Sequence, residues 1–189
     1  MFTLEDLEKS EALQTIVIPL IVPTQAEVTI CRNLDWSRYD LNACYGKPWI
    51  DARGKEQSWY DVQLTVNSED YLPSRKEWFY MVTDNGYIFK ACFTGKKIKK
   101  LNTFENKKII GEWIKNLLVA WEALDEFQFV HQDRGGIGIV TKEALEFYGG
   151  DTIFIKKTSK TKKDKRGIER DVWFISFPHK NYLEECGIQ

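Results

Sequence analysis

Apolar and polar residues alternate over short stretches of this chain, which is the pattern of β-strands with one buried face. The clearest stretch is 60–66, where Tyr60, Val62, Leu64 and Val66 fall on one side. β-Branched residues are frequent in several other stretches and favour an extended backbone. Strands are therefore predicted over seven segments: 15–22, 27–31, 60–66, 78–83, 87–93, 152–156 and 172–177.

The connection between segments 78–83 and 87–93 has the most specific local chemistry. Its residues are Asp84, Asn85 and Gly86. An Asn-Gly pair accepts the positive φ angles that a tight type I′ turn requires, so a hairpin with this turn is predicted.

Apolar residues recur with helical spacing in three other segments. Thr3 and Asp6 form an N-terminal capping pair, which predicts a helix over 3–14. A second helix is predicted over 106–118. A third is predicted from Thr141 to the glycine pair that begins at Gly149, because glycine commonly ends a helix.

The connections between the predicted strands are short and hairpin-like, unlike the long helical crossovers of a parallel sheet. We therefore predict a mainly β (α+β) protein, a small open barrel or sandwich of about seven strands with two or three short flanking helices. Its 189 residues suit a single domain over 1–189, in which 1–30 contributes a helix and strands as a cap.

Composition supports a packed interior, since 43% of residues are hydrophobic and 14% are aromatic. No apolar run approaches the roughly 20 residues of a membrane span, and the first residues are acidic where a secretory signal would be basic. Four scattered cysteines and two histidines lack metal-ligand spacing. A soluble, cytoplasmic protein with free thiols, no metal and no cofactor is predicted.

Charge is unevenly distributed although the net charge is only −1. Segment 1–30 carries five acids and one base. Segment 90–115 carries eight lysines and two acids, and segment 156–170 carries eight bases and two acids. Part of the last segment, 157–170, reads as a linker too charged to pack and is predicted to be a mobile hairpin tip.

Catalytic motifs are scarce. Neither a nucleophile elbow nor a phosphate-binding loop occurs, and His131 and His179 are interpreted as surface residues. The nearest set of residues to a metal-dependent nuclease site combines Glu143 or Glu146 with Asp151 and Lys156, but their spacing does not suit neighbouring strands. No catalytic centre is predicted, and a nuclease with an unrecognised site remains the alternative.

Two polar segments carry the chemistry of nucleic-acid binding. In 94–105 lysines alternate with Asn and Thr, and 33–58 combines Arg, Lys, Asn, Gln and Ser. Lysines neutralise phosphates, and the other side chains can read base edges. A protein–protein module remains a further alternative, because the second segment is also aromatic: Trp36, Tyr39, Tyr45, Trp49 and Trp59.

The order of several segments resembles a known family. The stretch 83–92 (TDNGYIFKAC) is followed by the lysine-rich segment, by 106–116 (NKKIIGEWIKN) and by 141–149 (TKEALEFYG). Together with 33–36 (NLDW), they resemble the B-three-like DNA-binding pseudobarrel of restriction endonucleases of the NgoFVII, BfiI and EcoRII kind. The resemblance covers about 33–177.

The resemblance implies a seven-stranded open barrel with two arms that grip the major groove, within 33–58 and 94–106. It also implies a restriction system in which double-stranded DNA and a nuclease or GTPase domain or subunit, as in McrBC-like LlaJI-type enzymes, are the partners. Segments 40–51 and 125–134 depart from the family as insertions. The candidate DNA-binding residues are Asn33, Trp36, Ser37, Arg38, Arg53, Lys55, Gln57, Lys96, Lys97, Lys99, Lys100, Asn102, Thr103, Asn106 and Lys107.

Overall fold

The computed structural model describes residues 2–30, 38–41, 52–54, 64–67, 70–124 and 140–180. The chain divides into two compact units. One, called here the sheet unit, comprises Met1–Pro19, Leu64–Asn106 and Thr152–Phe177. The other, called the helical unit, comprises Leu20–Gln63, Lys107–Asp151 and Pro178–Gln189. Most of the predicted strand 60–66 lies outside the described residues.

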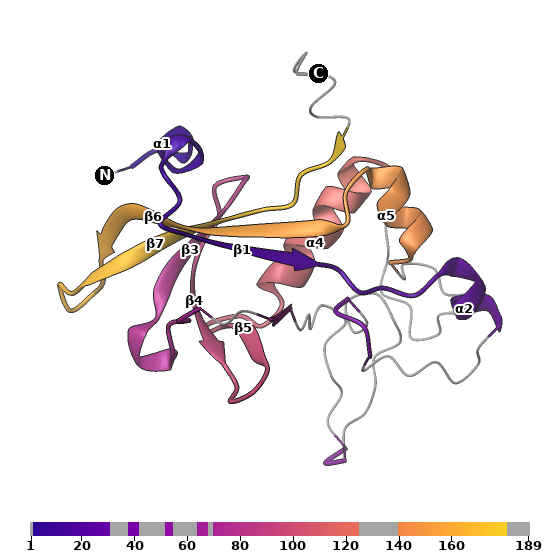
Figure 1. Cartoon of the computed structure of the whole chain (residues 1–189), viewed down its shortest axis with the longest axis horizontal. Coiled ribbons are helices and arrows are strands. Elements are labelled where there is room, and N and C mark those ends of the chain that lie inside the picture. The colour runs from indigo at the N-terminus through magenta and orange to yellow at the C-terminus, as the bar shows by residue number, and fades with distance from the viewer. Residues whose placement is uncertain are drawn as a thin grey trace. The chain divides into compact units, whose positions relative to one another are not determined.

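The sheet unit holds a seven-stranded mixed sheet with the order β1-β6-β7-β3-β4-β5-β2 (Figure 1). Strands β3 and β7 pair in parallel, and the other neighbouring strands are antiparallel. The edge strands β1 and β2 lie near each other, so the sheet nearly closes into a barrel with one open seam. The predicted open barrel is confirmed. The strands are β1 (Gln14–Pro19), β2 (Thr65–Val66), β3 (Phe79–Thr83), β4 (Ile88–Thr94), β5 (Lys99–Thr103), β6 (Thr152–Lys163) and β7 (Glu169–Ser176).

Aromatic rings fill the interior of the barrel. Trp173 is fully buried and stacks on Phe79, with 4.7 Å between ring centroids. Phe93 packs against both rings, at 5.6 Å from Phe79 and 5.9 Å from Trp173. Because these side chains come from β3, β4 and β7, they join the middle of the sheet into one core.

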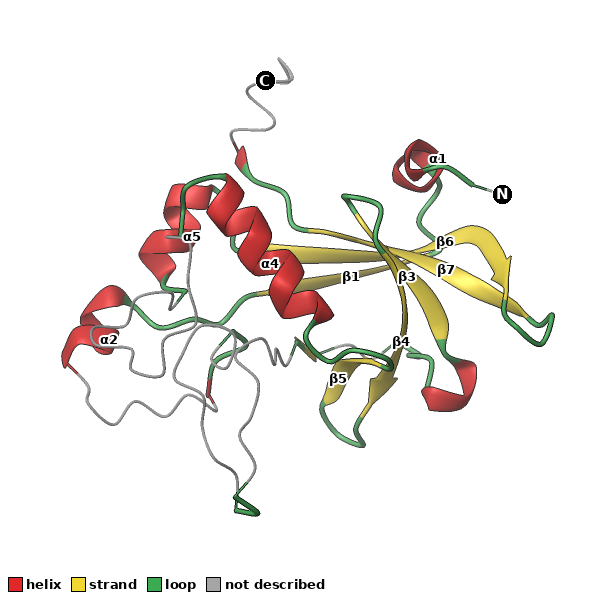
Figure 2. Ribbon diagram, turned by 180° about the vertical axis from the view of Figure 1, so that it is seen from behind, coloured by secondary structure: helices red, strands yellow, loops and turns green. Residues whose placement is uncertain are grey.

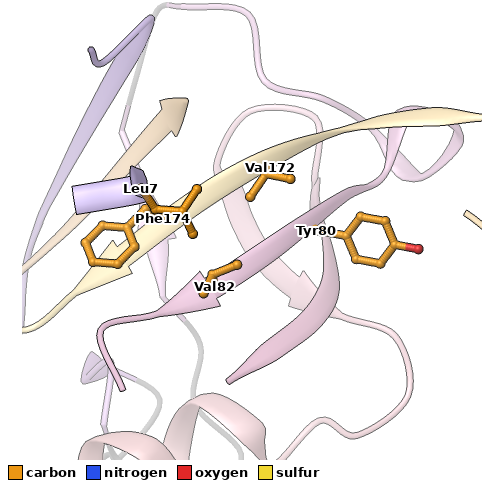
Figure 3. Packing of buried hydrophobic residues seen from close by; sticks show 5 residues of the cluster. All are labelled: Leu7, Tyr80, Val82, Val172 and Phe174. Carbon is orange, nitrogen blue, oxygen red and sulfur yellow. The ribbon is translucent and has the colours of Figure 1, made fainter. Parts of the chain in front are cut away.

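Helix α1 (Leu4–Lys9) covers part of the outer face of the sheet. A capping box begins it, as predicted: Thr3 Oγ1 accepts a hydrogen bond from Asp6 N, and Thr3 N donates to Asp6 Oδ2. Leu7 is fully buried in a cluster on this face, and Figure 3 shows its neighbours on β3 and β7: Tyr80, Val82, Val172 and Phe174.

The predicted extent of this helix, 3–14, is wrong at its C-terminal end, because the chain leaves the helix after Lys9 and enters β1 at Gln14. The ammonium group of Lys156 helps to end it. Its Nζ donates to the carbonyl oxygens of Glu8 at 2.7 Å and Ser10 at 3.0 Å, which the end of the helix leaves without intrahelical partners.

The helical unit contains α2 (Gln25–Ile30), α4 (Ile109–Ala120) and α5 (Lys142–Tyr148). The last two confirm the predicted helices, and α5 has the expected ends: Thr141 Oγ1 accepts from Ala144 N, and Gly149 has φ of 87°. The predicted strand at 27–31 is wrong, since its described residues belong to α2. Glu27 N donates to Thr24 Oγ1 at 3.1 Å and caps that helix.

His179 was predicted to lie at the surface, and this is wrong. Its side chain is 7% exposed and packs between Trp121, at 4.0 Å between ring centroids, and Tyr148, at 5.2 Å. Cys92 is a buried free thiol in β4, and burial raises its pKa. His131 and the other three cysteines lie outside the described residues.

The predicted hairpin of β3 and β4 is confirmed, but its turn is not of type I′. Gly86 has φ of 87°, whereas Asn85 is not among the residues with positive φ. Gly86 N donates to Thr83 O, and Thr83 N donates to Tyr87 O, both at 2.9 Å. These bonds define a three-residue loop in which a type I turn is followed by a left-handed glycine.

The prediction that 157–170 is too charged to pack is wrong, whereas the predicted hairpin tip within it is confirmed. Strands β6 and β7 run through most of this segment and are joined by a turn of the same three-residue kind (Figures 1 and 2). Asp164 N donates to Ile168 O at 2.8 Å, Gly167 N donates to Asp164 O at 3.0 Å, and Gly167 has φ of 80°. Thr158 is also buried, and its hydroxyl donates to Val172 O at 2.6 Å.

Candidate nucleic-acid interface

The lysine-rich segment 94–105 is largely a hairpin. Strand β4 continues to Thr94, β5 begins at Lys99, and four residues turn between them. Gly95 has φ of 111°, and a Cβ atom at this position would lie 2.1 Å from the carbonyl oxygen of Ile98. The tight turn therefore requires glycine there. It exposes Lys96 and Lys97 to solvent.

Side chains alternate between the two faces of β5. Leu101 is 5% exposed and Thr103 is 8% exposed, so both point into the barrel. Lys100 and Asn102 lie on the outer face, where Lys100 is exposed. The hydroxyl of Thr103 donates to the carbonyl oxygen of Asn106 at 2.9 Å and stabilises the bend that follows the strand.

The structure thus gathers five of the candidate residues on one hairpin: Lys96, Lys97, Lys99, Lys100 and Asn102. Lys99 is half-buried, and its Nζ donates to the carbonyl oxygen of Gly95 at 2.7 Å, which ties the lysine to its own turn. Thr103 has an internal bonding role. Asn106 is exposed at the end of the same segment.

Candidates in the other arm are described only in part. Arg38 and Arg53 are exposed and belong to the helical unit, as does the exposed Lys107 that precedes α4. The remaining candidates of this arm lie outside the described residues: Asn33, Trp36, Ser37, Lys55 and Gln57.

A group of cations that the sequence did not predict packs on aromatic rings at the outer face of the sheet unit. Arg170 and Lys90 lie over the Trp78 ring, at 4.4 Å and 5.0 Å from its centroid. Lys162 lies over Tyr80 at 5.3 Å. Register explains the group, because Lys90 is paired opposite Tyr80 and Lys162 opposite Arg170.

A cavity of about 380 Å³ opens beside Trp78 and is called here the Trp78 hollow. Two of its cations have acidic partners, with Lys90 Nζ 3.5 Å from Glu105 Oε1 and Arg170 Nε 3.1 Å from Asp164 Oδ2. The lining residues are Trp78, Lys90, Phe104, Glu105, Asp164, Lys165, Arg166 and Arg170. The spacing of Trp78 and Tyr80 in the sequence indicates that both rings lie on one face of a strand. The cations that cover these rings could not be predicted in the same way, because strand pairing brings them to this face.

Asp164 organises the tip of the β6–β7 hairpin. Its Oδ1 accepts from Arg166 N at 2.8 Å and from Ile168 N at 3.0 Å, and its side chain is only 5% exposed. Burial acts to raise the pKa of this carboxyl group. The hydrogen bonds from Ile168, Arg170 and Arg166 outweigh that effect and lower the pKa below its ordinary value.

Lys156 and Glu143, two residues of the nearest set to a metal-dependent nuclease site, have other roles in the structure. Lys156 donates to carbonyl groups at the end of α1, and its burial lowers its pKa. Glu143 Oε2 accepts from Gln25 N at 2.8 Å. Among the described residues, His, Cys, Asp and Glu side chains form no cluster suited to a metal ion. No helix in the described parts of the chain is long and apolar enough to cross a membrane.

A family profile of the NgoFVII C-terminal B3-like DNA-binding domain matches residues 21–159, which is most of the chain. The chain belongs to this family. The match confirms the resemblance found in the sequence, and a B3-like domain of this kind is a non-catalytic DNA-recognition domain. No curated protein sequence matches the chain.

The B3-like match includes the whole β4–β5 hairpin and ends within β6. The outer part of the β6–β7 hairpin, with its turn at Asp164–Ile168, therefore lies beyond the matched residues. The described part of the B3-like domain thus has two basic hairpins, of which the first lies wholly inside the family match and the second only in part.

Proposed function

We propose that this B3-like domain reads a specific sequence in double-stranded DNA as the non-catalytic recognition part of a restriction system. The observation that carries the proposal is the β4–β5 hairpin, which lies within the family match and has basic and amide side chains on its turn and outer face. The major groove of B-DNA is wide enough to admit a two-stranded ribbon of this kind.

The hairpin side chains divide into two chemical roles. Lys96, Lys97 and Lys100 supply charges for phosphates, which fix the position of the protein without reading sequence. Asn102 has an amide that can bond to the N6 and N7 atoms of adenine in the major groove. The second arm, within 33–58, would contribute Arg38 and Arg53, whose guanidinium groups suit guanine.

Cleavage would come from another domain or subunit, a nuclease or a GTP-dependent partner, as in the restriction enzymes whose recognition domains this chain resembles. The roles of Lys156 and Glu143 in holding the fold favour recognition over chemistry within the described residues. In this arrangement the B3-like domain positions the enzyme on its site.

The proposal is tested by fluorescence anisotropy with a labelled pool of random duplexes, followed by selection of the preferred site. Alanine at Lys96, Lys97 and Lys100 should weaken binding to every duplex by roughly ten- to a hundredfold and lower the salt dependence by about 0.9 per lost phosphate contact. Asn102→Ala should instead relax preference at one base pair, by about 1–3 kcal/mol.

A matched control replaces three exposed lysines that do not belong to the hairpin, Lys9, Lys142 and Lys180. It loses the same charge and should bind nearly as the wild-type protein does. Absent or salt-independent binding by the wild-type protein would refute the proposal, and equal losses in both triple variants would show that the hairpin has no special role.

A further inference from the structure

The β6–β7 hairpin is strongly basic and lies outside the surface assigned above to DNA. Its exposed cations are Lys160, Lys162, Lys163, Lys165 and Arg166. Acids near them are already engaged, since Asp164 bonds to Arg170 and Glu169 accepts from the hydroxyl of Thr161 at 2.9 Å. The tip therefore presents an excess of positive charge to solvent.

We propose that the tip of this hairpin, together with the Trp78 hollow, is a second DNA contact that binds the phosphodiester backbone beside the segment read by the arms. The inference rests on the proposed DNA binding and adds a surface to it. The turn at Asp164–Ile168 lies outside residues 21–159, which the family model matches.

Phosphate is the ligand that best fits the charges at the hollow. Lys90 and Arg170 line it with acidic partners, whereas Lys165 and Arg166 at the tip add two more positive charges. Four cations and two acids thus leave a net charge of +2 around the cavity. Arginine and lysine on a concave surface are the side chains with which proteins hold phosphate oxygens.

Stacking of an unpaired base is a poorer fit. The Trp78 ring already has Arg170 and Lys90 over it, and the guanidinium group of Arg75 lies 5.3 Å from the centroid of Phe104. The rings of the hollow therefore hold the cations in place instead of offering open faces to a base. Duplex backbone is favoured over a single strand for this reason.

The hairpin is also preorganised for binding. Asp164 bonds to two backbone amides and to Arg170, and Arg170 NH1 donates to the carbonyl oxygen of Lys76 at 3.3 Å. Fixing the backbone before binding lowers the entropy that must be lost in the complex. A lysine-rich loop without these hydrogen bonds would lose more conformational entropy when DNA binding orders it.

The position of the hollow suggests which phosphates it would meet. Phe104 and Glu105 line it just after β5 ends, whereas the lysine-bearing turn precedes β5. Five strand residues separate the two places, or roughly 16 Å at the rise of a β-strand. The hollow therefore lies about 16 Å along the strand from the turn, so a phosphate bound there would flank the bases that the turn contacts.

The test compares wild-type protein with the variant Lys165→Ala, Arg166→Ala on labelled duplexes of two lengths, one limited to the selected site and one extended by about one helical turn on each side. These residues lie at an exposed tip, and Asp164 and Arg170 are kept. The double variant should bind the extended duplex about tenfold more weakly, with a salt slope lower by about 1–2, and should bind the short duplex almost unchanged.

The matched control is Lys9→Ala, Lys142→Ala, which removes two exposed lysines from other elements and should leave both affinities unchanged. Unfolding midpoints of all proteins establish that the variants are folded. Unchanged affinity and slope on the extended duplex would overturn this inference while leaving the arms as the binding surface. Lack of binding by the wild-type protein to either duplex would instead overturn the proposed function itself.

Discussion

Trp173 occupies the centre of the barrel interior. Its side chain is fully buried, and its ring stacks on Phe79. The indole nitrogen Nε1 has no hydrogen-bond partner among the described residues. A buried donor without a partner lowers the free energy of unfolding, whereas burial of the large aromatic ring raises it. Trp173 therefore makes two opposing contributions to stability.

Two substitutions separate these contributions. Trp173→Ala should lower the free energy of unfolding by roughly 3–5 kcal/mol, because it leaves a large cavity between β3, β4 and β7. Trp173→Phe keeps an aromatic ring and removes the unpaired N–H, so its loss should be clearly smaller. Urea unfolding of both variants measures the difference, and equal losses would contradict the cavity between β3, β4 and β7 as the main cost of Trp173→Ala.

The exposure of a residue could be predicted from the sequence only where the sequence also showed which alternate residues of a strand face the interior. The lysines at the turn before β5 are exposed, as their charge suggested. Thr103 looked equally suited to DNA, yet it faces inward because Leu101 pairs with Phe93 and fixes which residues of β5 enter the barrel. Because that pairing depends on two separate strands, the local sequence of β5 alone could not predict that Thr103 faces inward.

At the scale of elements, the turn between β4 and β5 depends on one residue. Gly95 has φ of 111°, and a Cβ atom there would meet the Ile98 carbonyl at 2.1 Å. Gly86 in the turn between β3 and β4 also has positive φ, at 87°, but a Cβ atom there would meet no other atom within 4 Å. The two glycines form a natural pair for comparison.

We expect Gly86→Ala to cost about 1 kcal/mol of unfolding free energy, as a left-handed residue usually does, and Gly95→Ala to cost about 1–3 kcal/mol. Only Gly95→Ala should also weaken DNA binding, because it distorts the turn that presents Lys96 and Lys97. Urea unfolding and anisotropy measure both effects. Equal effects of the two variants on DNA affinity would contradict the assigned role of the β4–β5 hairpin.

Helices and strands were predicted well where local residue preferences determine them. They were predicted poorly where contacts between separate segments determine them. The β-branched residues before Cys31 favoured a strand, but Thr24 and Glu27 form a helix cap whose Thr-x-x-Glu spacing was visible in the sequence. The segment 157–170 looked too charged to pack. It packs because Thr158 bonds across the hairpin to Val172, and Arg170 bonds to Lys76, a distant residue in the sequence. Asp164 bonds within the turn to Ile168.

At the scale of the whole molecule, several carboxyl groups in both units have lowered pKa values. Hydrogen bonds from Thr3 lower that of Asp6, the Tyr39 hydroxyl lowers that of Glu27, and the Gln25 amide lowers that of Glu143. Asp164 belongs to the same group. A carboxyl whose pKa is lower when folded stabilises the protein above its unfolded pKa and loses this contribution as pH falls through the folded value.

The unfolding temperature should therefore fall as pH drops below about 4, where these groups take up protons. Asp164→Asn should be less stable than wild-type protein near neutral pH. The gap between them should narrow below about pH 4, because Asp164 then also becomes uncharged. Thermal unfolding at a series of pH values measures the gap, and a gap independent of pH would rule out this contribution of Asp164.

Among the described strands β7 comes last in the sequence, yet it lies inside the sheet, between β6 and the much earlier β3. During synthesis, β3, β4 and β5 emerge well before β7, and β3 remains without this neighbour until Ser176 has left the ribosome. The buried Trp173 arrives at the same late moment. Closure of the barrel must then be a late, long-range and comparatively slow event, and the nascent chain exposes a pairing edge of β3 to chaperones until it happens.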